Sequence, residues 1–389
     1  MAAAGYKPAA RLPITAVLRR ENMIITAAVA RAKSSPLSIE TLQLEDPRPD
    51  EILVHIVATG ICHTDIAMRD QTYPVPQPIV LGHEGAGIVQ TIGGAVTKVA
   101  PGDHVVMSFD SCGHCDSCKD HQPQYCFSNF EYNFGGKRPD GTSPLSKDGE
   151  VIHGNFFGQS SFATFSLCHE RNVVKVRHDA PLELLGPLAC GIQTGAGAII
   201  NSFKLGPGHS LAVFGAGTVG LSAVMAARLV GATTTIAIDL FEERLTMARE
   251  LGATHTINAR NEKAVDAIKR ITGNGVNFAF ETTGLPAVIR SGIDSLAPRG
   301  ICGMVGAAPD GTEVALDTQS MMGRGQSLRG IIEGDATPEV FIPQLIDLYL
   351  QGRFPFDRLV KFYSFDQINT AIADSEVGRA IKPVIRMPA

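Results

Sequence analysis

The sequence predicts a two-domain α/β protein in which a β-rich, barrel-like domain is followed by a doubly wound parallel sheet. From Met23 to about Phe165, short apolar runs such as EILVHIVATGIC and DHVVMSF alternate with turns that contain Gly and Pro, a pattern typical of β strands. From about Pro181, strand-like and helix-like segments alternate, and this βαβ rhythm predicts a parallel sheet with helices on both faces. At 389 residues the chain is also too long for one ordinary core.

Individual elements follow from the same patterns. In the first half we expect strands at 23–32, 51–62, 86–94 and 103–109. Residues 127–158 are rich in Gly, Asn, Pro and Ser and show little periodicity, so we expect a loop there. In the second half the expected strands are 210–217, 233–240, 277–284, 300–307 and 327–334, and the clearest helices are 218–231, 241–252 and 337–352.

Composition excludes several classes of partner. The net charge is −5 and no Lys/Arg cluster is present, so there is no electrostatic reason to expect binding to nucleic acid or to an anionic membrane. No apolar run reaches the roughly 18 residues that a membrane span needs. Eight cysteines are too few for a disulfide scaffold, and their clustering favours metal binding in a reducing compartment, hence a cytoplasmic protein.

The first 22 residues are basic and contain no acid before Glu21. One interpretation is a transit peptide. The other, which we favour, is a disordered tail or an upstream start codon, because Met23 opens a plausible strand, and we expect no contribution to catalysis.

A glycine-rich turn predicts a nucleotide site. Gly215, Gly217 and Gly220 form G-x-G-x-x-G directly after a strand and at the start of a helix, with Val219 inside the motif. The first glycine permits the tight turn, the second lets the backbone approach a pyrophosphate, and the third lets helix and strand pack closely, while the helix N-terminus attracts the phosphate charge. We therefore expect a Rossmann domain that contacts a dinucleotide through these residues.

An acid at the right distance specifies the cofactor. Asp239 ends the second strand of this domain, nineteen residues after Gly220. Its carboxylate can accept hydrogen bonds from both hydroxyls of the adenine ribose and would repel a 2′-phosphate, so NAD is favoured over NADP. Arg244 could favour a phosphate, but we expect the carboxylate to dominate. The alternative, a glycine-rich turn in an ordinary α/β sheet, is disfavoured because strand, helix and acid occur together.

Four cysteines form the strongest metal signal. The C-x2-C-x2-C-x7-C pattern can surround a tetrahedral zinc and leave no position open. Four reduced surface thiols are the alternative, disfavoured because exposed free cysteine is usually avoided. His114 and His121 lie nearby, but a four-cysteine site needs neither. The cysteines of this pattern are Cys112, Cys115, Cys118 and Cys126.

Cys62, His83 and Cys190 could supply three further ligands and leave a fourth position free. Each residue taken singly is more often part of a core or a surface than a ligand. The hypothesis strengthens beside a nicotinamide site, because a Lewis acid that lowers the pKa of an alcohol makes hydride removal easier. A closed and an open site together predict two zinc ions per chain, one structural and one catalytic.

The motifs also carry a family resemblance. GICHTD, GHEGAGIV, the four-cysteine run, CGIQTG and GAGTVG occur in the order seen in zinc-dependent medium-chain alcohol dehydrogenases, and the match extends from about residue 23 to the end. ATGICHTD, FFGQSSFATF, ELLGPLACGIQTGAG and GRFPFD most resemble aryl-alcohol (benzyl alcohol) dehydrogenases, whose relatives act on allylic alcohols such as geraniol. The resemblance implies a GroES-like first domain and a homodimer or homotetramer.

The resemblance also implies roles for individual residues. Cys62, His83 and Cys190 would bind the catalytic zinc, with water or substrate oxygen in fourth place. Glu84 resembles the family's carboxylate near the zinc, and Asp65 resembles the acid that orients the histidine ligand.

Further roles concern the proton, the cofactor and the substrate. Thr64 matches the hydroxyl that takes the alcohol proton, and His63 matches a contact to the cofactor pyrophosphate. Phe109 resembles an aromatic wall of the alcohol pocket, although an aromatic residue on a strand is as often core. Thr64 would pass the alcohol proton toward the nicotinamide ribose. Ala67 stands where many members have a histidine that completes the proton relay, so the route of the proton from the ribose to solvent stays open.

We therefore expect an enzyme that reversibly oxidises a primary aromatic or allylic alcohol to its aldehyde, with hydride transfer to NAD between the two domains. The alternatives are a polyol or other secondary-alcohol dehydrogenase of the same fold, and a non-enzymatic zinc- and nucleotide-binding protein. The expected parts of the chain are an N-terminal extension at 1–22, a catalytic zinc-binding domain at 23–190, an NAD-binding domain at 191–334 and a return to the catalytic domain at 335–389.

Overall fold

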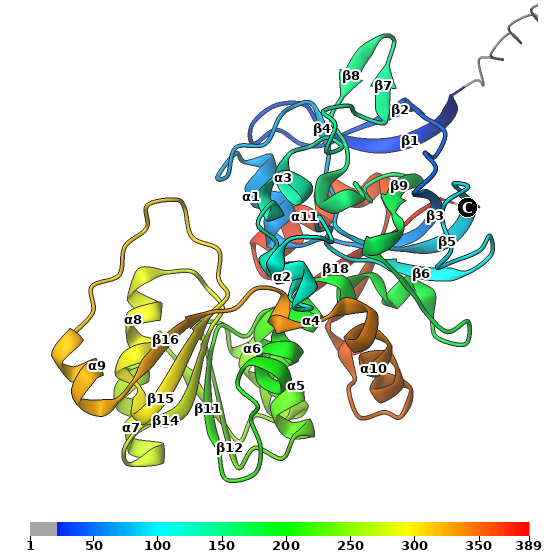
Figure 1. The fold of residues 1–389 in the computed structure, drawn as a ribbon. Helices are drawn as coiled ribbons and strands as arrows, with labels where there is room; N and C mark the ends of the chain where they lie inside the picture. The colour runs from blue at the N-terminus through cyan, green and yellow to red at the C-terminus, as the bar shows by residue number, and fades with distance from the viewer. Residues whose placement is uncertain (1–21, 389) are drawn as a thin grey trace, which may run out of the picture.

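The structure, a computed structural model, describes residues 22–388. It contains three sheets in two bodies: two sheets form the upper body in Figure 1, and a parallel sheet flanked by helices forms the lower one. This arrangement confirms the predicted fold class, a β-rich domain joined to a doubly wound parallel-sheet domain. No helix among the described residues is long and apolar enough to cross a membrane.

The upper body combines a five-stranded sheet in the order β4-β1-β2-β7-β8 with a seven-stranded sheet in which β10-β6-β5-β3-β18-β17 are neighbours and β9 also pairs with β3. The strands are β1 (Met23–Ala30), β2 (Ser38–Leu44), β3 (Glu51–Gly60), β4 (Ile79–Val80), β5 (Glu84–Ile92), β6 (His104–Met107), β7 (Leu145–Lys147), β8 (Glu150–Ile152), β9 (Phe165–His169), β10 (Val173–Lys175), β17 (Val360–Ser364) and β18 (Lys382–Arg386).

The lower body has a six-stranded sheet in the order β13-β12-β11-β14-β15-β16, with every neighbouring pair parallel. Its central strands are almost fully buried because helices cover both faces, which explains their continuous apolar runs. The strands are β11 (Ser210–Phe214), β12 (Thr234–Asp239), β13 (His255–Asn258), β14 (Val276–Glu281), β15 (Leu296–Met304) and β16 (Ser327–Gly330).

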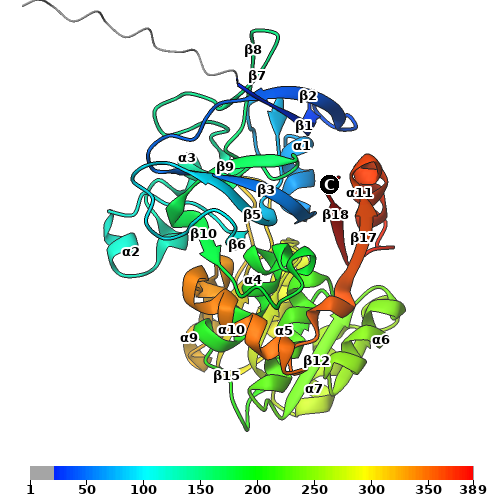
Figure 2. The same cartoon turned by 90° about the vertical axis from the view of Figure 1, so that its right-hand side faces the viewer.

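The helices of the upper body are short, and those around the parallel sheet are longer. Figure 2 shows α4 and α10 at the junction of the two bodies, and α11 packed beside β17 and β18. The helices are α1 (His63–Arg69), α2 (Asp116–Lys119), α3 (Asn129–Phe134), α4 (Gly191–Gly197), α5 (Thr218–Leu229), α6 (Glu242–Leu251), α7 (Ala264–Thr272), α8 (Pro286–Asp294), α9 (Thr318–Arg324), α10 (Pro338–Leu350) and α11 (Ile368–Glu376).

The expected loop at 127–158 is wrong in part, because it contains α3 and the β7–β8 hairpin. The hairpin turns at Asp148 and Gly149, whose φ angles of 50° and 87° suit a tight Asp-Gly turn. Helix α3 has only six residues, too few to show a period. It is held by tertiary bonds instead: Asn133 accepts from the amide of Asp110 at 2.9 Å and donates to its carbonyl at 3.0 Å.

Candidate active site

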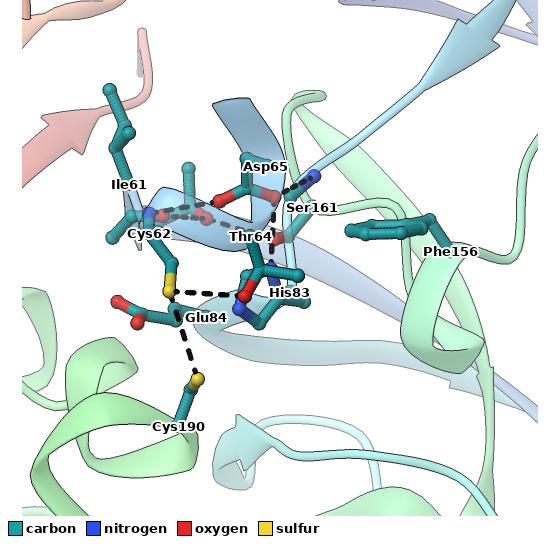
Figure 3. A network of polar contacts seen from close by, with 12 residues as sticks. Ile61, Cys62, Thr64, Asp65, His83, Glu84, Phe156, Ser161 and Cys190 are labelled. Atoms are coloured by element: carbon teal, nitrogen blue, oxygen red, sulfur yellow. Dashed lines mark hydrogen bonds and ion pairs between the residues drawn. The ribbon is translucent and has the colours of Figure 1, made fainter. Parts of the chain in front are cut away.

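Four potential ligands meet where the two bodies join. Their ligand atoms lie within 4.8 Å of one another, and Figure 3 shows the side chains converging with Thr64 beside them. The four residues are Cys62, His83, Glu84 and Cys190.

Strand register brings these distant residues together. β3 pairs antiparallel with β5 so that Gly60 lies opposite Glu84, and Cys62 and His83 therefore leave the sheet side by side. Cys190 approaches from the junction of the two bodies, immediately before α4. The approach is close at Gly186, where a Cβ atom would lie 2.2 Å from the Glu84 carbonyl oxygen.

The donor atoms fit a zinc ion. The Sγ atoms of Cys62 and Cys190 are 4.0 Å apart, near the separation of about 3.8 Å that tetrahedral geometry with Zn–S bonds near 2.3 Å requires. His83 Nε2 is buried and has no hydrogen-bond partner within residues 22–388, which would be costly unless a ligand completes it. The Cys190 contact lowers the pKa of the Cys62 thiol, which favours the thiolate that binds metal.

Asp65 orients two of these ligands. Its Oδ1 atom lies 2.9 Å from His83 Nδ1 and accepts from the Gly82 amide, while Oδ2 accepts from the Cys62 amide at 2.9 Å. The carboxylate is almost fully buried, so it holds the imidazole with Nε2 toward the two sulfurs. Thr64 lies in the same turn, with its Oγ1 atom 3.6 Å from Cys62 Sγ.

Lys382 is a site residue that the sequence did not reveal. Its Nζ atom lies 2.8 and 2.9 Å from the two carboxylate oxygens of Glu84 and donates to the Ile61 carbonyl at 3.1 Å. Both side chains are buried, and burial raises the pKa of Glu84 to about 7 although Lys382 opposes the shift. A lone lysine near the C-terminus is normally a surface residue, so only the pairing of β18 with β3 identifies it.

The second cluster is local and closed. The Sγ–Sγ distances are 3.9 Å between Cys112 and Cys118 and 4.0 Å between Cys115 and Cys126, again close to tetrahedral zinc. Backbone amides point at the sulfurs, with Cys115 N 3.3 Å from Cys112 Sγ and Cys112 N 3.3 Å from Cys126 Sγ. All four positions of a metal would be filled by protein.

A groove of about 970 Å³ joins the open cysteine cluster to the glycine-rich turn. Gly215, with φ +96°, makes the turn, and a Cβ at Gly217 would meet nothing within 4 Å, which leaves room for a pyrophosphate. Gly220 does not line the groove; a Cβ there would lie 1.8 Å from the Gly215 carbonyl oxygen, so it serves helix–strand packing. Among the predicted site residues, the groove lining includes Cys62, His63, Gly215, Gly217, Val219, Asp239 and Arg244.

Asp239 faces this groove, and both of its carboxylate oxygens already accept hydrogen bonds from backbone amides. Oδ2 accepts from the Ala216 amide at 2.7 Å, and Oδ1 accepts from the Leu240 and Phe241 amides at 2.7 and 3.0 Å. These bonds fix the carboxylate at the end of β12. The Arg244 guanidinium lies over the Phe241 ring, 5.0 Å from its centroid, and 3.9 Å from Asp239.

Aromatic side chains cover the other side of the open cluster. The Phe157 ring stacks on the His83 ring at a centroid distance of 4.6 Å, and Phe156 meets His83 edge-on at 5.7 Å. Phe157 has a left-handed backbone, with φ 51° and ψ 36°, which is uncommon for an aromatic residue. The predicted pocket residue Phe109 is buried in the apolar cluster that also contains Phe156 and Phe157. Its place in the wall of the alcohol pocket stays a prediction.

Comparison with known proteins agrees with this site. A model described as an alcohol dehydrogenase GroES-like domain matches residues 48–178, and one described as a zinc-binding dehydrogenase matches residues 218–351. Geraniol dehydrogenase of Castellaniella defragrans is 49% identical over 361 residues, which cover 92% of this chain and 96% of that protein.

Two solved structures are similar along their whole length. Benzyl alcohol dehydrogenase from Acinetobacter calcoaceticus is 49% identical with a TM-score of 0.92, and the alignment covers 94% of this chain and 100% of that one. An alcohol dehydrogenase zinc-binding domain protein from Burkholderia ambifaria is 56% identical with a TM-score of 0.93, covering 95% and 100%.

The chain therefore belongs to the zinc-binding alcohol dehydrogenase family. It is an oxidoreductase that acts on alcohols with zinc and a nicotinamide dinucleotide, which confirms the predicted enzyme class and these two kinds of cofactor. The number of zinc ions and the preference for NAD over NADP stay predictions.

Proposed function

We propose that this chain reversibly oxidises a primary aromatic or allylic alcohol to its aldehyde with NAD. Cys62, His83 and Cys190 hold the catalytic zinc, and the four-cysteine lobe (residues 112–126) holds a structural one. The observation that carries this proposal is the groove that runs from the glycine-rich turn to the open cluster, where His83 presents a buried, unpartnered Nε2 atom.

The side chains around the open cluster have distinct tasks. When bound, zinc supplies a Lewis acid that lowers the pKa of an alcohol, and NAD supplies the hydride acceptor. Thr64, whose hydroxyl lies 3.6 Å from Cys62 Sγ, would accept the proton of the alcohol while it donates its own hydroxyl proton onward, so it relays the proton and does not keep it. Asp65 holds His83 in the tautomer that leaves Nε2 free, and Lys382 neutralises Glu84 beside the cluster.

The aromatic wall favours an unsaturated substrate. The Phe157 ring is stacked on the His83 ring, and the Phe134 ring meets the Phe157 ring edge-on at a centroid distance of 5.0 Å. An apolar ring that enters the site would therefore contact aromatic surface directly beside a metal ligand. The relatives named for geraniol and benzyl alcohol support the same substrate class.

Steady-state kinetics on benzyl alcohol, geraniol, ethanol and sorbitol test this proposal. We expect the two unsaturated alcohols to have the highest kcat/KM, and Phe157→Leu to reduce that preference by about tenfold, or about 1.4 kcal/mol, within the range for an aromatic contact. Phe127→Leu, at an exposed aromatic residue outside this wall, is the matched control. Faster turnover of sorbitol would instead favour a polyol dehydrogenase.

The cofactor assignment has its own test. We expect Asp239→Gly to raise kcat/KM with NADP relative to NAD, by about tenfold or more, because it removes the carboxylate that repels a 2′-phosphate while leaving Arg244 in place. An unchanged preference would show that Asp239 serves only to hold the Ala216, Leu240 and Phe241 amides.

We also propose that the protein is a cytoplasmic homodimer or homotetramer. None of its eight cysteines, all within the described residues, forms a disulfide, which suits a reducing compartment. Strand β16 lies at the edge of the parallel sheet, and Leu285 and Met322 are exposed apolar residues. Light scattering on the purified protein tests the oligomeric state.

The domain limits are likewise proposed as 23–190 with 335–389 for the catalytic unit and 191–334 for the NAD-binding unit. The pairing of β18 with β3 supports this division, because it returns the C-terminal segment to the first sheet system. Limited proteolysis tests it, with cleavage expected at the junctions and not within either unit.

A further inference from the structure

The connection between β16 and α10 contains three consecutive residues with left-handed backbone. The φ angles are 50° at Glu333, 66° at Gly334 and 50° at Asp335. Such a conformation is unfavourable at residues other than glycine, so contacts from the surrounding structure must hold it. We call residues 333–335 the left-handed turn; Figure 1 shows the connection passing beside α2 and α4.

One set of contacts comes from the four-cysteine lobe. Tyr125, which directly precedes Cys126, donates its hydroxyl to Asp335 Oδ1 at 2.6 Å and accepts from the Ile332 amide at 3.3 Å. The other oxygen of Asp335 accepts from Ser202 at 2.5 Å and pairs with Arg329 at 2.8 Å. Asp335 is thus shared between the lobe and the parallel-sheet body.

The opposite side of the turn lies on the first residues of α4. A Cβ atom at Gly334 would lie 2.5 Å from the Gln193 carbonyl oxygen and 2.8 Å from that of Thr194, so only glycine permits this approach. Glu333 Oε2 accepts from Gln193 Nε2 at 2.9 Å and from Thr194 Oγ1 at 3.3 Å.

These contacts end next to the open cluster. Gln193 Nε2 also donates to the Ala189 carbonyl at 2.7 Å, so the residues on both sides of Cys190 are tied to Glu333. Contacts therefore run from Tyr125, the residue before Cys126, through the left-handed turn to the residues that flank Cys190.

We propose that Tyr125 is a positioning residue for the reaction: it fixes the left-handed turn and, through Glu333, the beginning of α4 beside Cys190. The four-cysteine lobe then does more than stabilise its own loop, because it sets the place at which the alcohol and the nicotinamide meet. This inference rests on the proposed assignment of the two cysteine clusters as metal sites.

The test is Tyr125→Phe in the full-length, zinc-loaded enzyme, with Tyr132→Phe in α3 as the matched control. The variant keeps the ring and loses only the hydroxyl. We expect two zinc atoms per chain and an unchanged Tm within about 2 °C, yet kcat/KM for benzyl alcohol reduced about tenfold, short of the hundredfold that a 1 Å misplacement can cost. We also expect a larger primary deuterium isotope effect with deuterated benzyl alcohol.

Binding of NADH supplies a readout that does not depend on turnover. The groove at the glycine-rich turn and Asp239 is untouched, so the dissociation constant should stay within about threefold of wild type. The emission maximum of bound NADH, which reports the surroundings of the nicotinamide, should shift toward that of free NADH in Tyr125→Phe and not in Tyr132→Phe.

A double-mutant cycle separates this inference from a general loss of stability. If both residues act through one turn, Tyr125→Phe should cost much less in a Glu333→Gln background than in wild type. Wild-type kinetics for Tyr125→Phe, additive effects in the cycle, or loss of one zinc would each overturn the inference. A single zinc atom in the wild type would remove the site assignment as well, whereas the other outcomes leave it intact.

Discussion

The two cysteine clusters are built in opposite ways. The four-cysteine lobe takes all its ligands from one short segment, and backbone amides of that segment point at the sulfurs. The open cluster takes Cys62 and Cys190 from positions 128 residues apart and surrounds them with a buried histidine, two carboxylates and a lysine. A metal site built locally can be closed and structural, whereas a reactive site needs ligands from several elements so that one position stays open.

The largest effect should come from removing one ligand of the open cluster. We expect Cys190→Ala to lose one zinc atom and to lower kcat by about a thousandfold or more, because a Lewis acid contributes several kcal/mol to the transition state. Metal analysis and steady-state kinetics measure both. Cys168→Ala, at a buried cysteine of β9, is the control and should keep two zinc atoms.

Removing one ligand of the closed cluster should affect stability more than catalysis. Cys118→Ser should also lose one zinc atom, but it should lower the free energy of unfolding by several kcal/mol, because binding at such a site contributes directly to folding. Its kcat should fall far less than that of Cys190→Ala. Equal kinetic effects in the two variants would erase the distinction between a structural and a catalytic cluster.

The ion pair beside the open cluster gives the next effect. Lys382→Met should lower the free energy of unfolding by about 3–5 kcal/mol, because it leaves the Glu84 carboxylate buried without its partner. Urea denaturation measures this change. The control is Lys361→Met on neighbouring β17, an exposed lysine paired with Asp374, which should lower the free energy of unfolding far less than Lys382→Met.

The smallest of these effects concerns ligand orientation. Asp65→Asn should weaken zinc binding at the open cluster by about ten- to a hundredfold, because the amide cannot accept from both His83 and the Cys62 backbone. Competition with a chelator measures the affinity. Asp70→Asn, at the end of the same helix and paired with Arg69, should leave it unchanged.

Short-range patterns predicted two local features of the structure well. The four-cysteine spacing and the strand–glycine–helix motif each lie within a few residues, so their geometry is almost fixed by the chain itself. The β7–β8 hairpin was missed although its Asp148-Gly149 turn was readable, because a short hairpin in a polar segment offers little alternation. Helix α3 carried no periodic signal, since Asn133 holds it through tertiary bonds.

By itself, then, the sequence determined the two-domain α/β architecture, because strand and helix patterns recur along each half of the chain. It also determined the closed cysteine cluster and the dinucleotide turn, because each depends on spacing within one segment. Only the tertiary structure decided that Lys382 neutralises Glu84, that Phe157 covers His83 and that Tyr125 reaches Asp335. Those contacts depend on strand register and on packing between segments up to about 300 residues apart, which no local pattern encodes.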